Sequence, residues 1–177
     1  DVGAGACDQS GVGRSELASL FWPELDGTQA TSYLRDSLRR LREQLPQKDI
    51  LMKYSTQVFL DPERTYVDVR DFSGKVASIK RSLIVWPSYK PIPAATLALM
   101  QEAVKLWRSP RFLYGIDLPP EGEYADWVIK TGQQLELDRQ YLLGKLAENA
   151  LVYSNPMQAL EWIQLGLQTD ELNPELN

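Results

Sequence analysis

One segment constrains the fold more than any other, because its leucines and arginines fall on opposite faces of a single helix. Apolar residues recur there every three or four positions, as expected for an amphipathic helix whose apolar stripe enters a core. They are Ala30, Leu34, Leu38, Leu41 and Leu45. Asp26-Gly27-Thr28 is expected to form a turn and a cap before this helix. Pro46 is expected to end it.

A second, shorter helix is expected just before this one. Ser15 is a suitable N-cap, and apolar residues follow it at helical spacing. They are Leu17, Leu20 and Phe21. Pro23 stops the segment, so two helices would be joined by a link of only a few residues.

The segment after Pro46 predicts a small β-hairpin followed by a further strand. The spans 50–54 and 57–61 fit two strands around a tight turn at Ser55-Thr56. The span 66–69 alternates as a short exit strand. Asp71 is expected to cap a helix that runs from Phe72 to about Arg81.

The rest of the chain is expected to be helical. Residues 83–93, with three prolines, are interpreted as a semi-rigid linker. Helices are expected over 94–107, 124–153 and 156–168, the last with Pro156 at its first position. Residues 112–119 are expected to form a loop whose apolar side chains pack against the helices. Residues 170–177 are expected to begin one further turn. The inward side chains expected for the last helix are Ala159, Leu160, Ile163 and Leu167. Helix pairs of this length resemble tetratricopeptide-type (TPR-like) hairpins.

Composition argues against several classes of function. The chain of 177 residues has no histidine, which removes the commonest general base and zinc ligand. It has no Walker-type phosphate loop, and no pair of carboxylates stands out. We therefore expect no enzyme, no catalytic or metal-binding residue and no cofactor.

Cysteine content and hydropathy point to a cytoplasmic protein. Cys7 is the single cysteine, so no intrachain disulfide can form. No apolar run approaches the roughly 20 residues of a membrane span, so no membrane association is expected. The glycine-rich residues 1–13 are interpreted as a flexible tail.

The arginines of the long amphipathic helix suggest a partner. Arg35, Arg39, Arg40 and Arg42 face only one acid, Asp36, within residues 35–42. The whole chain carries a formal charge of −5, which argues against unspecific polyanion binding but not against a local patch. The cluster is either a solvated helix face with pairs such as Arg39–Glu43 or the reading helix of a DNA-binding domain.

On the second interpretation, the helix has separate base-facing and phosphate-facing residues. Thr31, Ser32, Arg35 and Arg39 would face base edges, where arginine can pair with guanine. Arg40 and Arg42 point more sideways and would suit phosphate oxygens.

These segments together resemble the bacterial SARP-type transcriptional activators. That family joins an OmpR/PhoB-like winged helix-turn-helix to a bacterial transcriptional activator domain of TPR-like helices. The matching runs are Arg14-Ser15-Glu16-Leu17-Ala18, Leu20-Phe21-Trp22-Pro23, Leu34-Arg35 with Leu38, Leu41-Arg42 and Leu45, Val67-Asp68-Val69 with Phe72, Phe112-Leu113-Tyr114-Gly115, Leu118-Pro119, Glu123-Tyr124 with Trp127, and Asp170-Glu171-Leu172-Asn173.

The resemblance implies a mainly α fold with a small β-hairpin, divided into two domains. The winged-helix DNA-binding domain would span 14–82, and the TPR-like domain would span 94–177. Lys53 and Thr56 would lie in the wing, near the neighbouring minor groove. The link 24–27 would contact RNA polymerase. The implied function is sequence-specific activation of transcription on double-stranded DNA, with a homodimer on direct repeats.

One departure from the family keeps a second interpretation open. Family members place several strands and a first helix before the position of Ser15, and only 14 residues precede it here. Without that helix, the apolar side chains of the short helix would be under-covered. The alternative is a TPR-like protein–protein interaction module with no DNA binding of its own.

Overall fold

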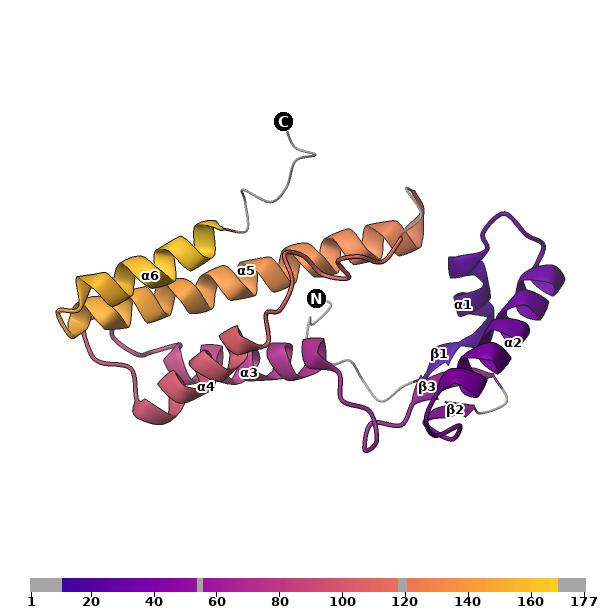
Figure 1. Ribbon diagram of the computed structural model, residues 1–177, viewed down its shortest axis with the longest axis horizontal. Coiled ribbons are helices and arrows are strands. Elements are labelled where there is room, and N and C mark those ends of the chain that lie inside the picture. The colour runs from indigo at the N-terminus through magenta and orange to yellow at the C-terminus, as the bar shows by residue number, and fades with distance from the viewer. Residues whose placement is uncertain (1–10, 54–55, 118–120, 169–177) are drawn as a thin grey trace. The chain divides into compact units, whose positions relative to one another are not determined.

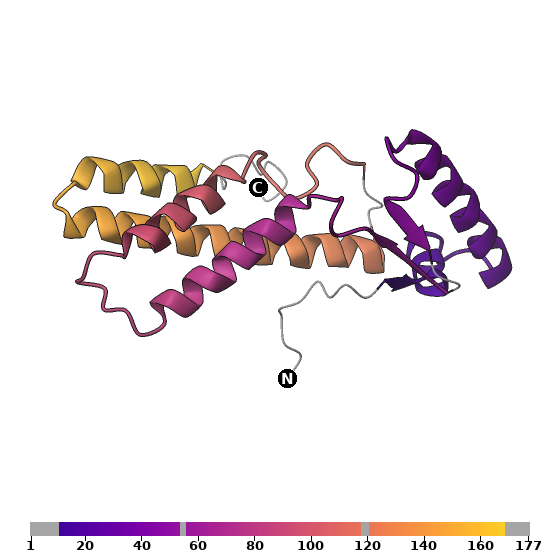
Figure 2. The same ribbon diagram turned by 90° about the horizontal axis from the view of Figure 1, so that it is seen from below.

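The computed structural model of the protein describes residues 11–53, 56–117 and 121–168. These residues form six helices and three short strands, so the fold is mainly helical with a small antiparallel sheet (Figures 1 and 2). The chain divides into two compact units. The first comprises Asp1–Val67 with Pro119–Tyr124, and the second comprises Asp68–Leu118 with Ala125–Asn177.

The first unit places two helices before a β-hairpin. In chain order its elements are β1 (Val12–Gly13), α1 (Arg14–Phe21), α2 (Gly27–Gln44), β2 (Leu51–Lys53) and β3 (Gln57–Leu60). The sheet order is β1-β3-β2, with all pairs antiparallel. Val58 of β3 lies opposite Val12 on one side and Lys53 on the other. The hairpin therefore gains a third strand from residues just ahead of α1.

A small apolar core joins the helices of the first unit to its sheet. Its buried members come from both helices and both hairpin strands. They are Ala18, Ala30, Leu34, Leu38, Leu51 and Val58. Leu17 and Trp22 pack against this core, whereas Phe21 is 46% exposed. The predicted lack of cover over α1 is therefore confined largely to Phe21 among the described residues.

Two local expectations for the first unit were wrong. α1 begins at Arg14 with Gly13 at its N-cap, and no side chain caps it, so Ser15 is not the cap. Val12 and Gly13 pair with β3, so the tail expected over 1–13 does not include them. Gly11 passes close to β3, because a Cβ there would lie 3.0 Å from the Phe59 ring. Cys7 lies outside the described residues.

The second unit consists of four helices. They are α3 (Asp68–Leu83), α4 (Ala94–Lys105), α5 (Glu123–Val152) and α6 (Pro156–Leu167). The expected strand at 66–69 is wrong, because Asp68 already begins α3. Val69 lies one turn before Phe72 and extends the apolar stripe of α3, which favours helix over a short isolated strand. Asp71 therefore lies in the first turn of α3 and does not cap it.

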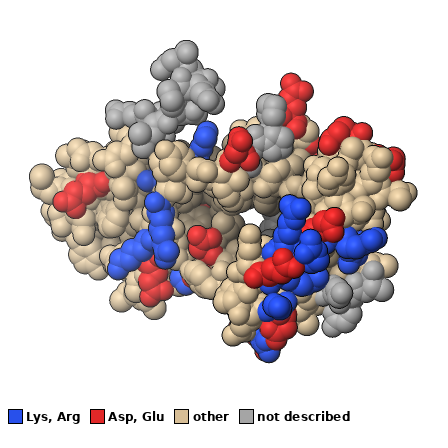
Figure 3. Space-filling model, turned by 45° about the vertical axis from the view of Figure 1, so that its right-hand side comes forward, with Lys and Arg blue, Asp and Glu red and all other residues tan. Residues whose placement is uncertain are grey.

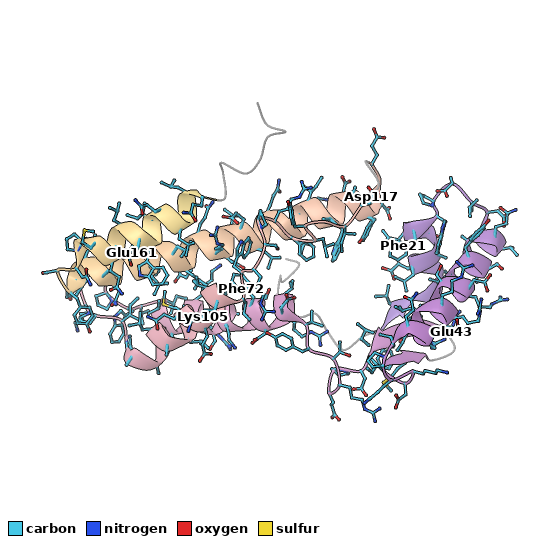
Figure 4. All side chains as sticks on the ribbon, viewed as in Figure 1. Phe21, Glu43, Phe72, Lys105, Asp117 and Glu161 are labelled. Carbon is cyan, nitrogen blue, oxygen red and sulfur yellow. The ribbon has the colours of Figure 1, made fainter. Side chains whose placement is uncertain are left out.

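The core of the second unit lies between α3, α4 and α5. Ile79, Met100 and Leu142 come from these three helices and are fully buried. Phe72, labelled in Figure 4, belongs to the same cluster, as does Leu135 of α5. Leu97 and Val104 of α4 pack against this cluster, and so does Trp107, which follows the helix.

Three polar residues of α5 are buried, and each binds a different neighbouring segment. Asp138 accepts a hydrogen bond from Lys80 of α3 at 2.6 Å. The side-chain oxygen of Asn149 accepts the Ile92 N–H at 2.8 Å. Arg139 donates to the Leu165 carbonyl of α6 at 2.7 Å. These bonds fix α5 to the helices and the loop around it.

The inward face of α6 differs from the expected one. Ala159 is buried against Ala147 and Ala150 of α5, and Trp162 packs beside them. The other three residues expected to face inward, Leu160, Ile163 and Leu167, are exposed. Met157 is exposed as well. Small residues let α5 and α6 lie side by side closely, so the helix turns its alanine toward α5 and leaves larger side chains outside.

The division into units also differs from the predicted domain bounds. α3 packs on α4 and contributes to the core of the second unit, although the sequence assigned it to the 14–82 domain. Residues 84–93 lie between these two helices within one unit and do not separate two domains. In the loop after α4, Phe112 packs on the core while Tyr114 and Ile116 are exposed. The expected turn at 170–177 lies outside the described residues.

Candidate nucleic-acid interface

The candidate site is the exposed side of α2, which is positioned by its cap and by its leucines. The Asp26 carboxylate accepts hydrogen bonds from the N–H groups of Thr28 and Gln29, at 2.9 and 3.0 Å. This confirms the predicted cap. Leu34 and Leu38 are buried against the sheet, so the opposite face of α2 points to solvent. Leu41, expected on the buried stripe, is exposed.

Two arginines and one serine that were predicted to contact DNA are exposed and have no side-chain partner among the described residues. The side chains of Ser32, Arg35 and Arg40 form no hydrogen bond or ion pair with another residue in the described part of the chain. Arg39 is also exposed, but its guanidinium pairs with the Glu43 carboxylate at 2.9 Å. We call Ser32, Arg35 and Arg39 the cationic face, because helical spacing places them side by side.

Two other predicted residues are turned toward the protein itself. The Thr31 hydroxyl donates to the Gly27 carbonyl at 2.6 Å. Arg42 is half-buried and approaches the Leu51 carbonyl of β2 at 3.5 Å, a long contact that ties α2 to the sheet. Both geometries suit a structural role more directly than contact with a ligand.

The predicted wing residues lie at the ends of β2 and β3. Thr56 is exposed, and its carbonyl accepts the Arg14 N–H at 2.8 Å, which links the start of α1 to the hairpin. Lys53 ends β2, and its side chain lies outside the described residues. Lys53 and Thr56 thus flank the tip of the hairpin, while the cationic face lies on α2.

Acidic side chains reduce the positive charge of this surface. Figure 3 shows blue and red atoms interspersed on its right-hand part, where the first unit lies. Glu43, labelled on α2 in Figure 4, and Asp36 are the acids of this helix beyond its cap. Beside the hairpin, Arg64 forms an ion pair with Asp49, and this hydrogen bond holds the pKa of the Asp49 carboxyl below its usual value.

The described residues contain no cluster of side chains that could bind a metal ion. No group of three potential metal ligands comes together among residues 11–53, 56–117 and 121–168. None of the helices described is both long and apolar enough to cross a membrane.

The second unit contains a cavity that the sequence did not predict, lined by residues from α3, α5 and the segment after α4. The aromatic and arginine residues over 107–114 are the signal that could have indicated it.

No protein-family model, no curated protein and no solved structure matches this chain.

Proposed function

We propose that this protein is a DNA-binding transcriptional regulator whose first unit reads duplex DNA through the exposed side of α2. The observation that carries this proposal is the order β1-α1-α2-β2-β3, with the hairpin directly after a capped helix that is cationic outside. In winged helix-turn-helix proteins, the second helix of the helix pair enters the major groove. The same order and the arginines of α2 support that assignment here.

Different exposed residues of α2 would contact base edges and phosphates. Arg35 can donate two parallel hydrogen bonds to the acceptors of guanine, and Ser32 can donate or accept beside it. Arg40 is placed on another side of the helix, where a phosphate oxygen would be the partner. Thr56 and Lys53 would approach the neighbouring minor groove from the hairpin.

Fluorescence anisotropy with a random pool of short duplexes tests the proposal, at two salt concentrations and with sequencing of the bound fraction. We expect salt-dependent binding and an enriched sequence. Arg35→Ala should weaken binding by about 1–3 kcal/mol if it contacts a base. Arg81→Ala is the matched control, because it removes the same charge from an exposed position of α3.

The Arg39–Glu43 pair gives a sharper test that predicts a gain of binding. The Glu43 carboxylate holds the Arg39 guanidinium and would itself repel phosphate. Glu43→Gln should therefore strengthen duplex binding several-fold at low salt, and Arg39→Ala should weaken it. Absence of duplex binding at low salt, or equal binding by all these variants, would contradict the assignment of this face.

Activation would further require contact with RNA polymerase, which the family resemblance assigns to the link 24–27. Glu24 in this link is exposed, and Asp26 is committed to the cap of α2. Glu24→Ala should therefore lower polymerase recruitment in a reconstituted transcription assay without changing duplex affinity. A homodimer on direct repeats would appear as two-step binding to the enriched sequence.

A second candidate function is a protein–protein interaction module. It is favoured by the exposed apolar side chains of α6, among them Leu160, Ile163 and Leu167. Large exposed apolar patches mark interaction surfaces. If the chain shows no duplex affinity at low salt and a partner maps to residues 94–177, this function replaces the first.

A further inference from the structure

The cavity in the second unit has a volume of about 260 Å³ and largely apolar walls. Phe72 on the first turns of α3, Trp107 after α4 and Leu135 of α5 line it. Phe112 and Leu113 of the following loop line it as well. Small-molecule sites in proteins are typically concave, apolar and provided with a few polar groups.

The aromatic walls of this cavity are held by contact with one another and with a buried arginine. The rings of Phe72 and Trp107 lie 6.0 Å apart, centre to centre. The Arg139 guanidinium lies 5.0 Å from the centre of the Trp107 ring, and Arg139 is itself buried. Leu113 has a backbone φ of +53°, a conformation that costs a non-glycine residue free energy. A preformed wall reduces the entropy that a ligand would lose on binding.

The polar residues of the cavity carry one net positive charge. Arg108, Arg111 and Asp68 line it, two cations against one acid. Arg108 is exposed and forms no hydrogen bond or ion pair with another residue of the described ranges. The Arg111 guanidinium lies over the Tyr114 ring at 5.9 Å. Arginine matches the two oxygens of a carboxylate with two parallel hydrogen bonds.

We infer that this cavity binds a small aromatic carboxylate. Its ring would lie against Phe72, Trp107 and Phe112 on the cavity side of these rings, and its carboxylate would pair with Arg108 and Arg111. The single negative charge of such a ligand matches the net charge of the polar residues. At about 260 Å³ the cavity lies just below the usual range for ligand sites, roughly 300–1,000 Å³, which suits a bicyclic ring better than a nucleotide or a long acyl chain.

Isothermal titration calorimetry on the whole chain tests this inference with 2-naphthoate and its neutral analogue 2-naphthamide. We expect saturable binding of 2-naphthoate and about tenfold weaker binding of the amide, because the amide lacks a charge-assisted hydrogen bond. Changing Arg108→Gln and Arg111→Gln together should weaken 2-naphthoate by a similar factor. Arg81→Gln, the same change outside the cavity, should leave its affinity unchanged.

Nuclear magnetic resonance locates the ligand independently of these variants. The chain has five tryptophans, so five indole N–H signals are expected. Addition of 2-naphthoate should move the Trp107 signal, assigned with Trp107→Phe, and leave that of Trp22 in place. No saturable binding, equal affinity for acid and amide, an unchanged affinity in the double variant or a static Trp107 signal each overturns the inference. Duplex binding by the first unit is measured separately and does not enter this test.

Discussion

Replacement of Arg139 by alanine should destabilise the second unit more than any change to an exposed arginine. The Arg139 side chain is only 5% exposed and lies within α5. One of its terminal nitrogens donates to the Leu165 carbonyl at 2.7 Å, and the other pairs with Glu136 at 3.3 Å. Its guanidinium also lies over Trp107. A single side chain thus connects α5 to α6 and to the segment after α4.

The size of the effect follows from these contacts. A hydrogen bond from a charged group contributes about 1.5–3 kcal/mol, and a desolvated cation–π contact contributes about 2 kcal/mol. Removal of the buried charge returns part of its desolvation cost. Glu136 stays behind, but its side chain is 23% exposed and can be hydrated. We therefore expect a loss of about 3 kcal/mol, near the lower limit for breaking a buried pair.

Urea unfolding followed by tryptophan fluorescence measures this loss, provided that the signal reports the second unit alone. Trp22 belongs to the first unit, and the other four tryptophans belong to the second. A Trp22→Phe background therefore confines the signal to the second unit. The unfolding free energy of each variant is extrapolated to zero urea, and variants are compared when the unfolding free energy has the same dependence on urea concentration. A change in that dependence marks a departure from two-state behaviour or a change in the compactness of the unfolded state.

Two further variants separate the polar contacts from packing. Arg139→Met keeps a long apolar stem but loses the hydrogen bonds and the charge, so its stability should lie between those of wild type and Arg139→Ala. Arg81→Ala, at an exposed position of α3, should change stability by less than about 0.5 kcal/mol. A loss below about 1 kcal/mol for Arg139→Ala would refute the reasoning, because the three contacts would then contribute almost nothing net.

Three other predictions concern single contacts. Asp26→Ala should cost the first unit about 1 kcal/mol through loss of the α2 cap, whereas the asparagine variant should retain most of it; thermal unfolding with Trp22 as the probe measures both. Asn149→Ala should cost about 1–3 kcal/mol in urea unfolding, because the Ile92 N–H loses its partner at a buried position. Arg64→Gln should raise the pKa of Asp49 toward its ordinary value, which an NMR titration of the carboxyl carbon detects. In the wild type this pair should stabilise the fold at neutral pH and cease to do so as the pH falls through the lowered pKa of Asp49.

The sequence predicted the elements of the first unit well because local signals there agree. The Asp26 cap, the spacing of Leu34 and Leu38 and the stop at Pro46 all indicate one helix, and the structure has it over Gly27–Gln44. The third strand was missed because Val12 and Gly13 are too short a segment to show any alternation. Their pairing depends on the non-local contact with β3, which no local pattern encodes.

The second unit shows where helical periodicity is insufficient. For α6, the expected inward face comprised Ala159, Leu160, Ile163 and Leu167, yet of these four only Ala159 is buried against α5 and the three larger side chains are exposed. Close approach of two helices favours the smaller side chain, and the sequence alone does not state which neighbour will approach. The candidate site shows the same dependence on neighbouring elements. The exposure of Arg35 could be predicted from helical spacing, whereas the contact of Arg42 with the Leu51 carbonyl could be recognised only once the position of the sheet was known.

The three buried polar residues of α5 have a consequence for helix register. Leucine and alanine contacts change little when one helix slides past another by a turn, about 5.4 Å, because one apolar side chain replaces another. Asp138, Arg139 and Asn149 each bind a partner outside α5, on α3, on α6 and on the loop before α4 respectively. A slide of α5 by one turn would break these three bonds together and leave Asp138 and Arg139 with their partners within α5, Gln134 and Glu136. These residues therefore select one alignment of the bundle from several that apolar packing alone would allow.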